Sequence, residues 1–375
     1  MDKNTIGILR IDSLHFFVRD LERNRAHYTK QLGFVERAVS GPEFTFAHGV
    51  QASLLEAGEV CFVFMAPVSG DSECASWLAR HPEGVGRVVF EVQDVEHAYH
   101  VLRTRGATPT SAIEQGELID GRVRWFDIAT PLGATTFRFV QRAGMRAIFP
   151  GLIRHERRRG VPGNRFGVLG IDHLTSNFLS LAPAVAWMEQ VLGFERFWDI
   201  SFHTRDVRAE ADGGSGLNSI VMWDPASGIK LANNEPAAPA LENSQIYRFC
   251  VEHRGAGVQH VALAVQNILG CVSVMRGRGV GFMPTPSAYY DRIRERGIQL
   301  TESIEKLRRL QVLVDGEGSE YLLQIFLRDA ASTFGDAEAG PLFLELIQRK
   351  GDRGFGAGNF RALFESIERE QTRAA

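Results

Sequence analysis

The sequence predicts an α+β fold made of two tandem copies of one module, each copy curled into an open barrel. The chain has 375 residues, which is long for one domain and sufficient for two, each with a core of its own. Three segments of the first half recur in the same order in the second half. Short strands outnumber helices in each copy, which favours curled sheets with their helices outside and their concave faces inside.

The first repeated segment covers residues 10–34 and 170–194, which begin RIDSLHFF and GIDHLTSN. Each copy is typical of a strand followed by an amphipathic helix. Both copies close on Leu-Gly-Phe, where Gly33 or Gly193 suits the left-handed position at the end of a helix.

The second repeated segment is a strand followed by a helix, and the third is a strand alone. GVGRVVFEVQD at 84–94 matches GVQHVALAVQN at 257–267, and TTFRFVQR at 135–142 matches LFLELIQR at 342–349. The repeats predict a first domain over residues 1–145 and a second over 167–375. Residues 146–166, with FPG, VPG and a basic cluster at 153–160, are expected to form a solvated linker between the two domains.

Composition excludes several classes of protein. The hydrophobic fraction is 44% and the net charge is −3, so neither disorder nor a nucleic-acid surface is expected. The four cysteines form no CxxC pair, which fits reduced thiols in the cytoplasm. No stretch of about 18 apolar residues and no basic-then-apolar leader is present, so no membrane association is expected.

Aligning the two copies residue by residue shows three differences that belong together. A metal-binding side chain of the second copy replaces a poor ligand of the first at each position, and the pairs are Ser13 with His173, Arg87 with His260, and Arg138 with Glu345. A single histidine in a strand is usually structural, and His15 and His253 are expected to be so. The three differences together select two imidazoles and one carboxylate, the facial triad of non-haem Fe(II) oxygenases, which leaves positions open for substrate and O2.

A resemblance to a known family strengthens this hypothesis. GIDHLTSN, GLNSIVM, NEPA, SQI, GAGVQHVAL, YLLQIF, FLELIQRKG and GFGAGNFRALFESIEREQ stand in this order over residues 167–372. The second half with these motifs resembles 4-hydroxyphenylpyruvate dioxygenases, members of the vicinal oxygen chelate superfamily with βαβββ modules. HPEGVGRVVFEVQDVEHAY in the first half is similar to the non-catalytic domain of that family.

The resemblance assigns roles to individual residues. It implies Fe(II) ligation by His173, His260 and Glu345, and orientation of the substrate by the catalytic-site residues Ser219, Asn234, Gln245 and Gln324. Gln259, Phe326, Phe343, Phe355 and Phe360 would line the substrate pocket. Apolar residues spaced as on one helix face, from Phe360 to Ile367, predict a C-terminal lid helix at about 358–371. A homodimer or homotetramer is also implied.

The implied reaction is oxidative decarboxylation of a 2-oxo acid, 4-hydroxyphenylpyruvate, by O2. Hydroxylation of the ring with side-chain migration would give homogentisate, and benzylic hydroxylation of the same substrate would make the chain a 4-hydroxymandelate synthase. Retention of Asn234 and of GFGAGNF favours homogentisate. One departure bears on this choice, because Ala232 stands where the family usually has proline.

Three other kinds of protein from the superfamily fit the sequence less well. An extradiol dioxygenase would carry a further catalytic histidine, which no remaining motif supplies. A glyoxalase-type isomerase would share its ligands between modules, which Ser13, Arg87 and Arg138 do not permit. A non-enzymatic binding protein would have no reason to keep the triad.

Overall fold

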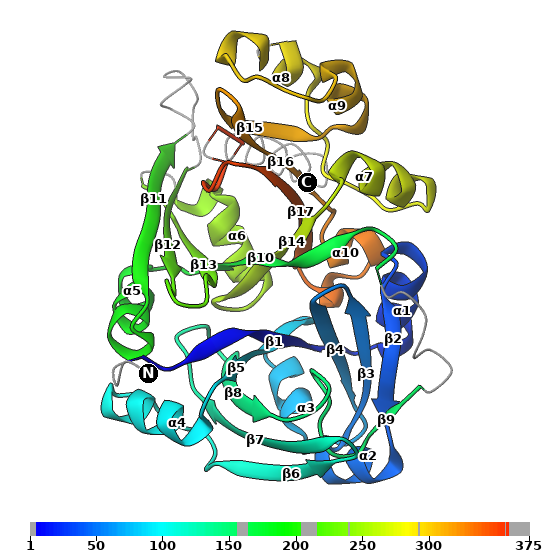
Figure 1. The fold of residues 1–375 in the computed structure, drawn as a ribbon, viewed down its shortest axis with the longest axis vertical. Coiled ribbons are helices and arrows are strands. Elements are labelled where there is room, and N and C mark those ends of the chain that lie inside the picture. The colour runs from blue at the N-terminus through cyan, green and yellow to red at the C-terminus, as the bar shows by residue number, and fades with distance from the viewer. Residues whose placement is uncertain are drawn as a thin grey trace.

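The fold consists of two curled mixed sheets, one in each half of the chain, and Figure 1 shows them one above the other. The computed structural model describes residues 5–155, 164–203, 216–238, 241–291, 293–356 and 358–359. Within them no helix is both long and apolar enough to cross a bilayer.

The first half contains two βαβββ units with two added helices. Its elements are β1 (Ile8–Phe17), α1 (Leu21–Ala26), η1 (His27–Gln31), β2 (Val35–Ser40), α2 (Pro42–His48), β3 (Val50–Ala57), β4 (Val60–Pro67), α3 (Glu73–Leu78), β5 (Gly84–Val92), α4 (Val95–Thr104), β6 (Glu114–Leu118), β7 (Gly121–Ile128) and β8 (Thr136–Arg142). A short strand β9 (Leu152–Arg154) follows in the segment predicted as a linker and pairs with β2.

The second half repeats this order with longer insertions. Its elements are β10 (Val168–Asn177), α5 (Ala182–Trp187), η3 (Met188–Leu192), β11 (Glu195–His203), β12 (Gly216–Trp223), β13 (Lys230–Pro236), η5 (Leu241–Asn243), α6 (Gln245–Glu252), β14 (Gly257–Val265), α7 (Ile268–Gly277), α8 (Ser287–Asp291), η6 (Ile293–Arg296), α9 (Ile304–Leu310), β15 (Leu313–Glu317), β16 (Glu320–Phe326), α10 (Ala330–Phe334), η7 (Ala337–Ala339) and β17 (Phe343–Lys350).

The two sheets have the same strand order, which confirms the internal repeat. The first runs β6-β7-β8-β5-β1-β4-β3-β2-β9, and the second runs β11-β12-β13-β10-β14-β17-β16-β15 from the opposite edge. Local structure repeats as well. In each copy the first helix widens into a π-helical turn, η1 or η3, before Gly33 or Gly193 adopts a positive φ of 74° or 71°.

The strand register places the three unlike residue pairs at equivalent points. Ser13 of β1 pairs with Val89 of β5, which pairs with Arg138 of β8. The corresponding row of the second sheet consists of His173, Ala262 and Glu345. One row further, His15 pairs with Arg87 as Thr175 pairs with His260. The alignment of the two copies therefore corresponds to a real structural superposition of their concave faces.

Helices α3 and α6 also correspond, although the sequence repeats did not reveal them. Each begins after a serine whose hydroxyl accepts a backbone N–H, Ser72 or Ser244, and each lies within the curve of its own sheet (Figure 1). Glu73 therefore begins α3 at the place where Gln245 begins α6.

The convex faces of the sheets share one hydrophobic core. This core includes Phe16, Phe62 and Phe90 from the first half and Met188 and Leu263 from the second, each at most 3% exposed. Because the core is continuous, burial of apolar surface joins the two halves.

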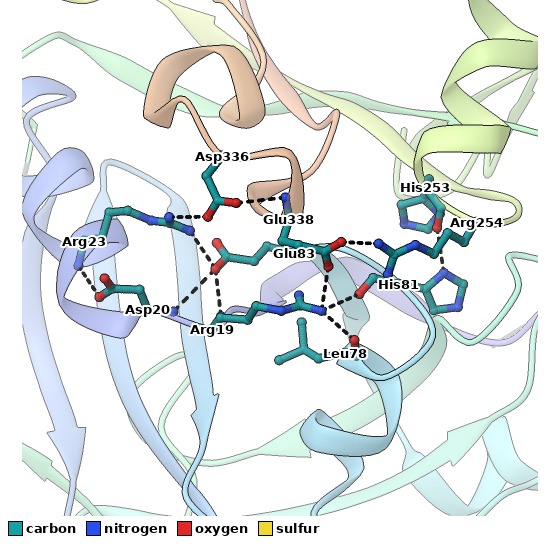
Figure 2. Close-up of polar contacts among 10 residues, drawn as sticks. All are labelled: Arg19, Asp20, Arg23, Leu78, His81, Glu83, His253, Arg254, Asp336 and Glu338. Carbon is teal, nitrogen blue, oxygen red and sulfur yellow. Dashed lines mark hydrogen bonds and ion pairs between the residues drawn. The ribbon is translucent and has the colours of Figure 1, made fainter.

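A second junction between the halves is polar, and Figure 2 shows it between the α3–β5 loop and η7. The Arg23 guanidinium donates to Glu83 of its own half at 2.8 Å and to Asp336 of the other half at 2.7 Å. Beside it, the rings of His81 and His253 lie 4.9 Å apart, and His81 Nδ1 lies 2.9 Å from the His253 carbonyl. These histidines follow the corresponding helices α3 and α6, so the repeat brings its own two copies into contact here.

Candidate metal centre

Three side chains converge on the concave face of the second sheet from β10, β14 and β17. His173, His260 and Glu345 are buried, and one ligand atom of each lies within 4.8 Å of the others. Glu345 Oε2 lies 3.5 Å from His173 Nε2 and 3.3 Å from His260 Nε2. Neighbouring ligands on one ion are about 3 Å apart when each bond is about 2.1 Å, so the donor atoms fit a single divalent ion.

Each ligand is held by a second contact on its far side. His173 Nδ1–H donates to Asp172 Oδ1 at 2.9 Å, which leaves Nε2 free to bind an ion. His260 Nδ1 faces Gln259 Oε1 at 3.2 Å, and Gln324 Nε2 donates to Glu345 Oε1 at 2.9 Å. Contacts of this kind fix the tautomer and the orientation of the ligands before any ion binds.

Electrostatics also favour a cation between the three side chains. Burial by itself would raise the pKa of Glu345, but the two neighbouring imidazoles outweigh this effect and lower that pKa to about 2. Burial lowers the pKa of His260. For His173, hydrogen bonds to Asp172 and Glu345 outweigh burial and raise the pKa to about 9. His173 holds a proton firmly because the carboxylates of Asp172 and Glu345 are close to it. A divalent ion would balance the same negative charge.

Asp172, the partner of His173 Nδ1, is in turn held by Arg349. The guanidinium donates to both carboxylate oxygens at 2.7 Å and also to the carbonyls of Asp352 and Gly354. The first copy repeats this pair with Arg142 and Asp12. Arg349 therefore connects the orientation of His173 to the backbone that leads to Phe355.

Four buried polar groups beside the triad each have an atom with no hydrogen-bond partner in the described part of the chain. They are Asn177 Nδ2, Ser219 Oγ, Asn234 Oδ1 and Gln245 Oε1. Asn234 pairs with Asn177 on β10 and with Ser219 on β12, so these three share one face of the sheet. Buried polar atoms without partners are costly, and their grouping here indicates a site for a polar ligand.

Aromatic rings enclose the triad. The Phe355 ring lies 5.0 Å from His173 in an edge-on arrangement, and the Phe343 ring stacks on His260 at 4.9 Å. Phe326 lies 6.0 Å from the His260 ring. These residues exclude water from the ligands and provide apolar surface for a ring. Phe360 and nearly all of the predicted lid helix at 358–371 lie outside the described residues.

Comparisons with known proteins agree with this geometry. Models of the Glyoxalase/Bleomycin resistance protein/Dioxygenase superfamily match residues 12–123 and 170–296. The 4-hydroxyphenylpyruvate dioxygenase of Dictyostelium discoideum is 34% identical over 370 residues, which cover 96% of this chain and 97% of that protein. That of Caenorhabditis elegans is 34% identical over 388 residues, covering 99% and 94%. The chain belongs to the 4-hydroxyphenylpyruvate dioxygenase family.

A solved structure of a family relative supports the same fold. A triple mutant of 4-hydroxymandelate synthase from Streptomyces coelicolor superimposes with a TM-score of 0.82 at 28% identity, covering 97% of this chain and 99% of that one. Together with the two matched halves, this confirms the expected tandem vicinal oxygen chelate fold. The domain boundaries at 145 and 167 stay a prediction.

Ala232, at the position where the sequence resemblance leads us to expect proline, lies on the same strand as Asn234. It is 2% exposed and packs with Val221 and Phe355 on the concave face. Asn234, two residues on, still points to that face, because its Nδ2 donates to Asn177 at 3.1 Å. Asn233 bonds the carbonyls of Leu231 and Ile220 instead. In the described structure, alanine at 232 leaves the Asn234 amide on the concave face of the sheet, beside Asn177 and Ser219.

Sequence reasoning missed Asn177, Asp172 and Arg349. Asn177 ends the motif GIDHLTSN and has the same strand parity as His173, which is the signal that could have found it. Asp172 and Arg349 adjoin or follow predicted ligands, but the identical residues Asp12 and Arg142 in the first copy concealed them from a search for differences.

Proposed function

We propose that this chain is an Fe(II)-dependent dioxygenase that converts 4-hydroxyphenylpyruvate and O2 to homogentisate and CO2. The observation that carries the proposal is the convergence of His173, His260 and Glu345 in one half of a duplicated fold. Relatives named 4-hydroxyphenylpyruvate dioxygenase, aligned over nearly the whole chain, support the choice of substrate and reaction.

The metal site would be completed by iron. Two imidazoles and a carboxylate form the donor set typical of non-haem Fe(II) oxygenases. Bound Fe(II) would supply the redox and Lewis-acid chemistry for reaction with O2, and the remaining positions would accept the 2-oxo acid. The protein's own part is then to bind, to orient and to exclude water.

Orientation of the substrate would come from the amide-rich face. Asn177, Ser219, Asn234 and Gln245 can hydrogen-bond the polar groups of a hydroxyphenyl substrate through the atoms that lack partners. Gln324 would keep the Glu345 carboxylate in place, since its own carbonyl oxygen is held by Asn359 Nδ2 at 2.9 Å. Gln259 would act through His260 and not by touching substrate.

The apolar part of the cavity would protect the reaction from water. Phe343 and Phe355 lie directly against the two histidine ligands, and Phe326 completes this side. We include Phe360 and a lid helix over about 358–371 in the proposal, as well as a homodimer or homotetramer, because family membership supports them. A cytoplasmic location is also proposed.

Product analysis tests the proposal. Purified protein with Fe(II), ascorbate and air-saturated buffer is given 4-hydroxyphenylpyruvate, and products are compared by chromatography with authentic homogentisate and 4-hydroxymandelate. The two products are isomers, so mass alone does not distinguish them. We expect homogentisate, with one CO2 released for each O2 consumed.

Two other results have definite meanings. 4-Hydroxymandelate would retain the iron site but overturn ring hydroxylation, and it would implicate Ala232 in the choice of reacting carbon. Absence of O2 consumption by iron-loaded protein would overturn the proposed reaction. Glu345→Gln serves as the inactive control, because it retains the size of a metal ligand without its charge.

A further inference from the structure

The first barrel contains a cavity that the proposed function does not use. It has a volume of about 950 Å³ and lies on the concave face of the first sheet, beneath α2 and α3. Sites for small organic ligands typically occupy 300–1,000 Å³. The cavity stands where the second barrel has its metal centre, because the strand registers of the two sheets coincide.

Cationic side chains replace the metal ligands in this cavity. Arg87 stands at the position of His260 and Arg138 at that of Glu345, and both line the cavity. Their side chains are 6% and 13% exposed. Asp127 replaces Phe326, and Glu73 replaces Gln245 at the start of the inner helix. Guanidinium groups cannot bind a metal ion, but they bind carboxylates in a fixed geometry.

The carboxylates around the two arginines are unequally placed. Asp127 is 8% exposed and accepts two hydrogen bonds of 2.7 Å from Arg138, while its distance to Arg87 is 3.4 Å. Glu73, the other partner of Arg87, has a side chain that is 54% exposed at the edge of the cavity. Two buried cations therefore share one buried anion, while the other carboxylates near Arg87, those of Glu73 and Glu114, are exposed to solvent. Burial and repulsion by Arg87 lower the pKa of Arg138, whereas Asp127 and Glu73 outweigh burial and raise the pKa of Arg87.

The rest of the lining suits an aromatic body. Trp125 and Phe149 face one another edge-on at 5.6 Å, and the Arg138 guanidinium lies 5.5 Å from the first ring and 5.2 Å from the second. Two buried nitrogens of the lining, His15 Nδ1 and Trp77 Nε1, have no hydrogen-bond partner among the described residues. Both side chains are almost fully buried, so solvent does not provide the missing hydrogen-bond partner. A ligand bound in the cavity could supply it.

We propose that the first barrel binds a small aromatic carboxylate, with the carboxylate at Arg87 and Arg138 and the ring against Trp125 and Phe149. The carboxylate of such a ligand would place a negative charge between the two guanidinium groups. Asp127 does this only in part, because it lies closer to Arg138 than to Arg87. The site requires no metal and is independent of the reaction proposed for the second barrel.

Calorimetric titration of the full-length protein with phenylacetate tests this proposal. Binding with Kd of about 1 mM or tighter is expected. Arg87→Gln should weaken it roughly ten- to a hundredfold, because a charged hydrogen-bond partner is lost. Its fold should survive, since Asp127 keeps Arg138 and Glu73 is already half-exposed. Arg122→Gln, at an exposed arginine of the same half, is the control and should bind as the wild type does.

A second substitution should change the affinity for phenylacetate in the opposite direction. Glu73→Gln removes the carboxylate that competes for Arg87 and should tighten phenylacetate binding several-fold, which a merely structural role would not produce. His260→Ala should leave this binding unchanged. The proposal is overturned if phenylacetate does not bind at about 10 mM, if Arg87→Gln binds normally, or if His260→Ala alone abolishes binding.

Discussion

Replacing Arg349 with methionine should weaken metal binding although Arg349 does not touch the metal. The substitution removes two hydrogen bonds of 2.7 Å from Asp172, whose side chain is 8% exposed and whose other partner is His173. Without Arg349 the Asp172 carboxylate would no longer be fixed in place, so the contact that orients the His173 ring would be lost. Changes behind a metal ligand typically cost 10- to 100-fold in affinity, or about 1.4–2.7 kcal/mol.

Competition against a coloured chelator measures this affinity. The fold itself supplies a matched control, because Arg142 holds Asp12 in the first copy as Arg349 holds Asp172 in the second. Arg142→Met should lower the free energy of unfolding, since this pair is almost fully buried, but should leave metal affinity unchanged. If Arg142→Met does not fold, the exposed Arg122→Met replaces it as the control.

Two outcomes would contradict this prediction. Wild-type affinity in Arg349→Met would show that Asp172 does not need its partner to orient His173. Equal weakening in Arg349→Met and in the control would show that general loss of stability, and not the contact behind His173, determines metal affinity.

Three further predictions concern the cavity and the junction. Gln324→Leu should lower metal affinity and kcat by about tenfold each, because Glu345 loses the 2.9 Å hydrogen bond that orients it; chelator competition and steady-state kinetics check both. Phe355→Ala should lower the free energy of unfolding by about 3 kcal/mol, measured by denaturation, because a buried ring is lost. It should also form more side products from O2 per turnover, because water would reach the metal ligands more easily. Burial lowers the pKa of His253 to about 4, against about 6.5 when unfolded, so its contribution of about 3 kcal/mol is present above pH 6.5 and lost towards pH 4. Denaturation between pH 4 and pH 7 should show a shallower loss of stability in His253→Asn, and an unchanged slope would contradict the assignment.

The duplicated fold could be predicted from sequence because its register is encoded in residues common to both copies. Leu-Gly-Phe, Val-Gln and Gln-Arg align the halves, and the alignment then isolates His173, His260 and Glu345. The three ligands can be identified because they differ from the residues at the same positions of the first copy. The same procedure could not find Asp172 or Arg349, which are identical in both copies.

Other features depended on tertiary contacts that no local pattern encodes. Helices α3 and α6 are only six and eight residues long, and their place inside the barrels follows from packing against the sheets. His81 and His253 meet only because the two halves pack around a common core. The cavity of the first barrel could not be predicted either. In the sequence, Arg87 and Arg138 indicate only that metal ligands are missing from the first copy, and not that a cavity is present.

The iron content of the purified protein after loading with Fe(II) shows directly which copy of the barrel holds the metal. We predict one iron per chain in the wild type and in Arg87→Gln, and close to none in His260→Ala, the equivalent position of the second copy. Iron retained by His260→Ala, or lost from Arg87→Gln, would contradict the claim that only the second copy of the duplicated barrel holds the metal.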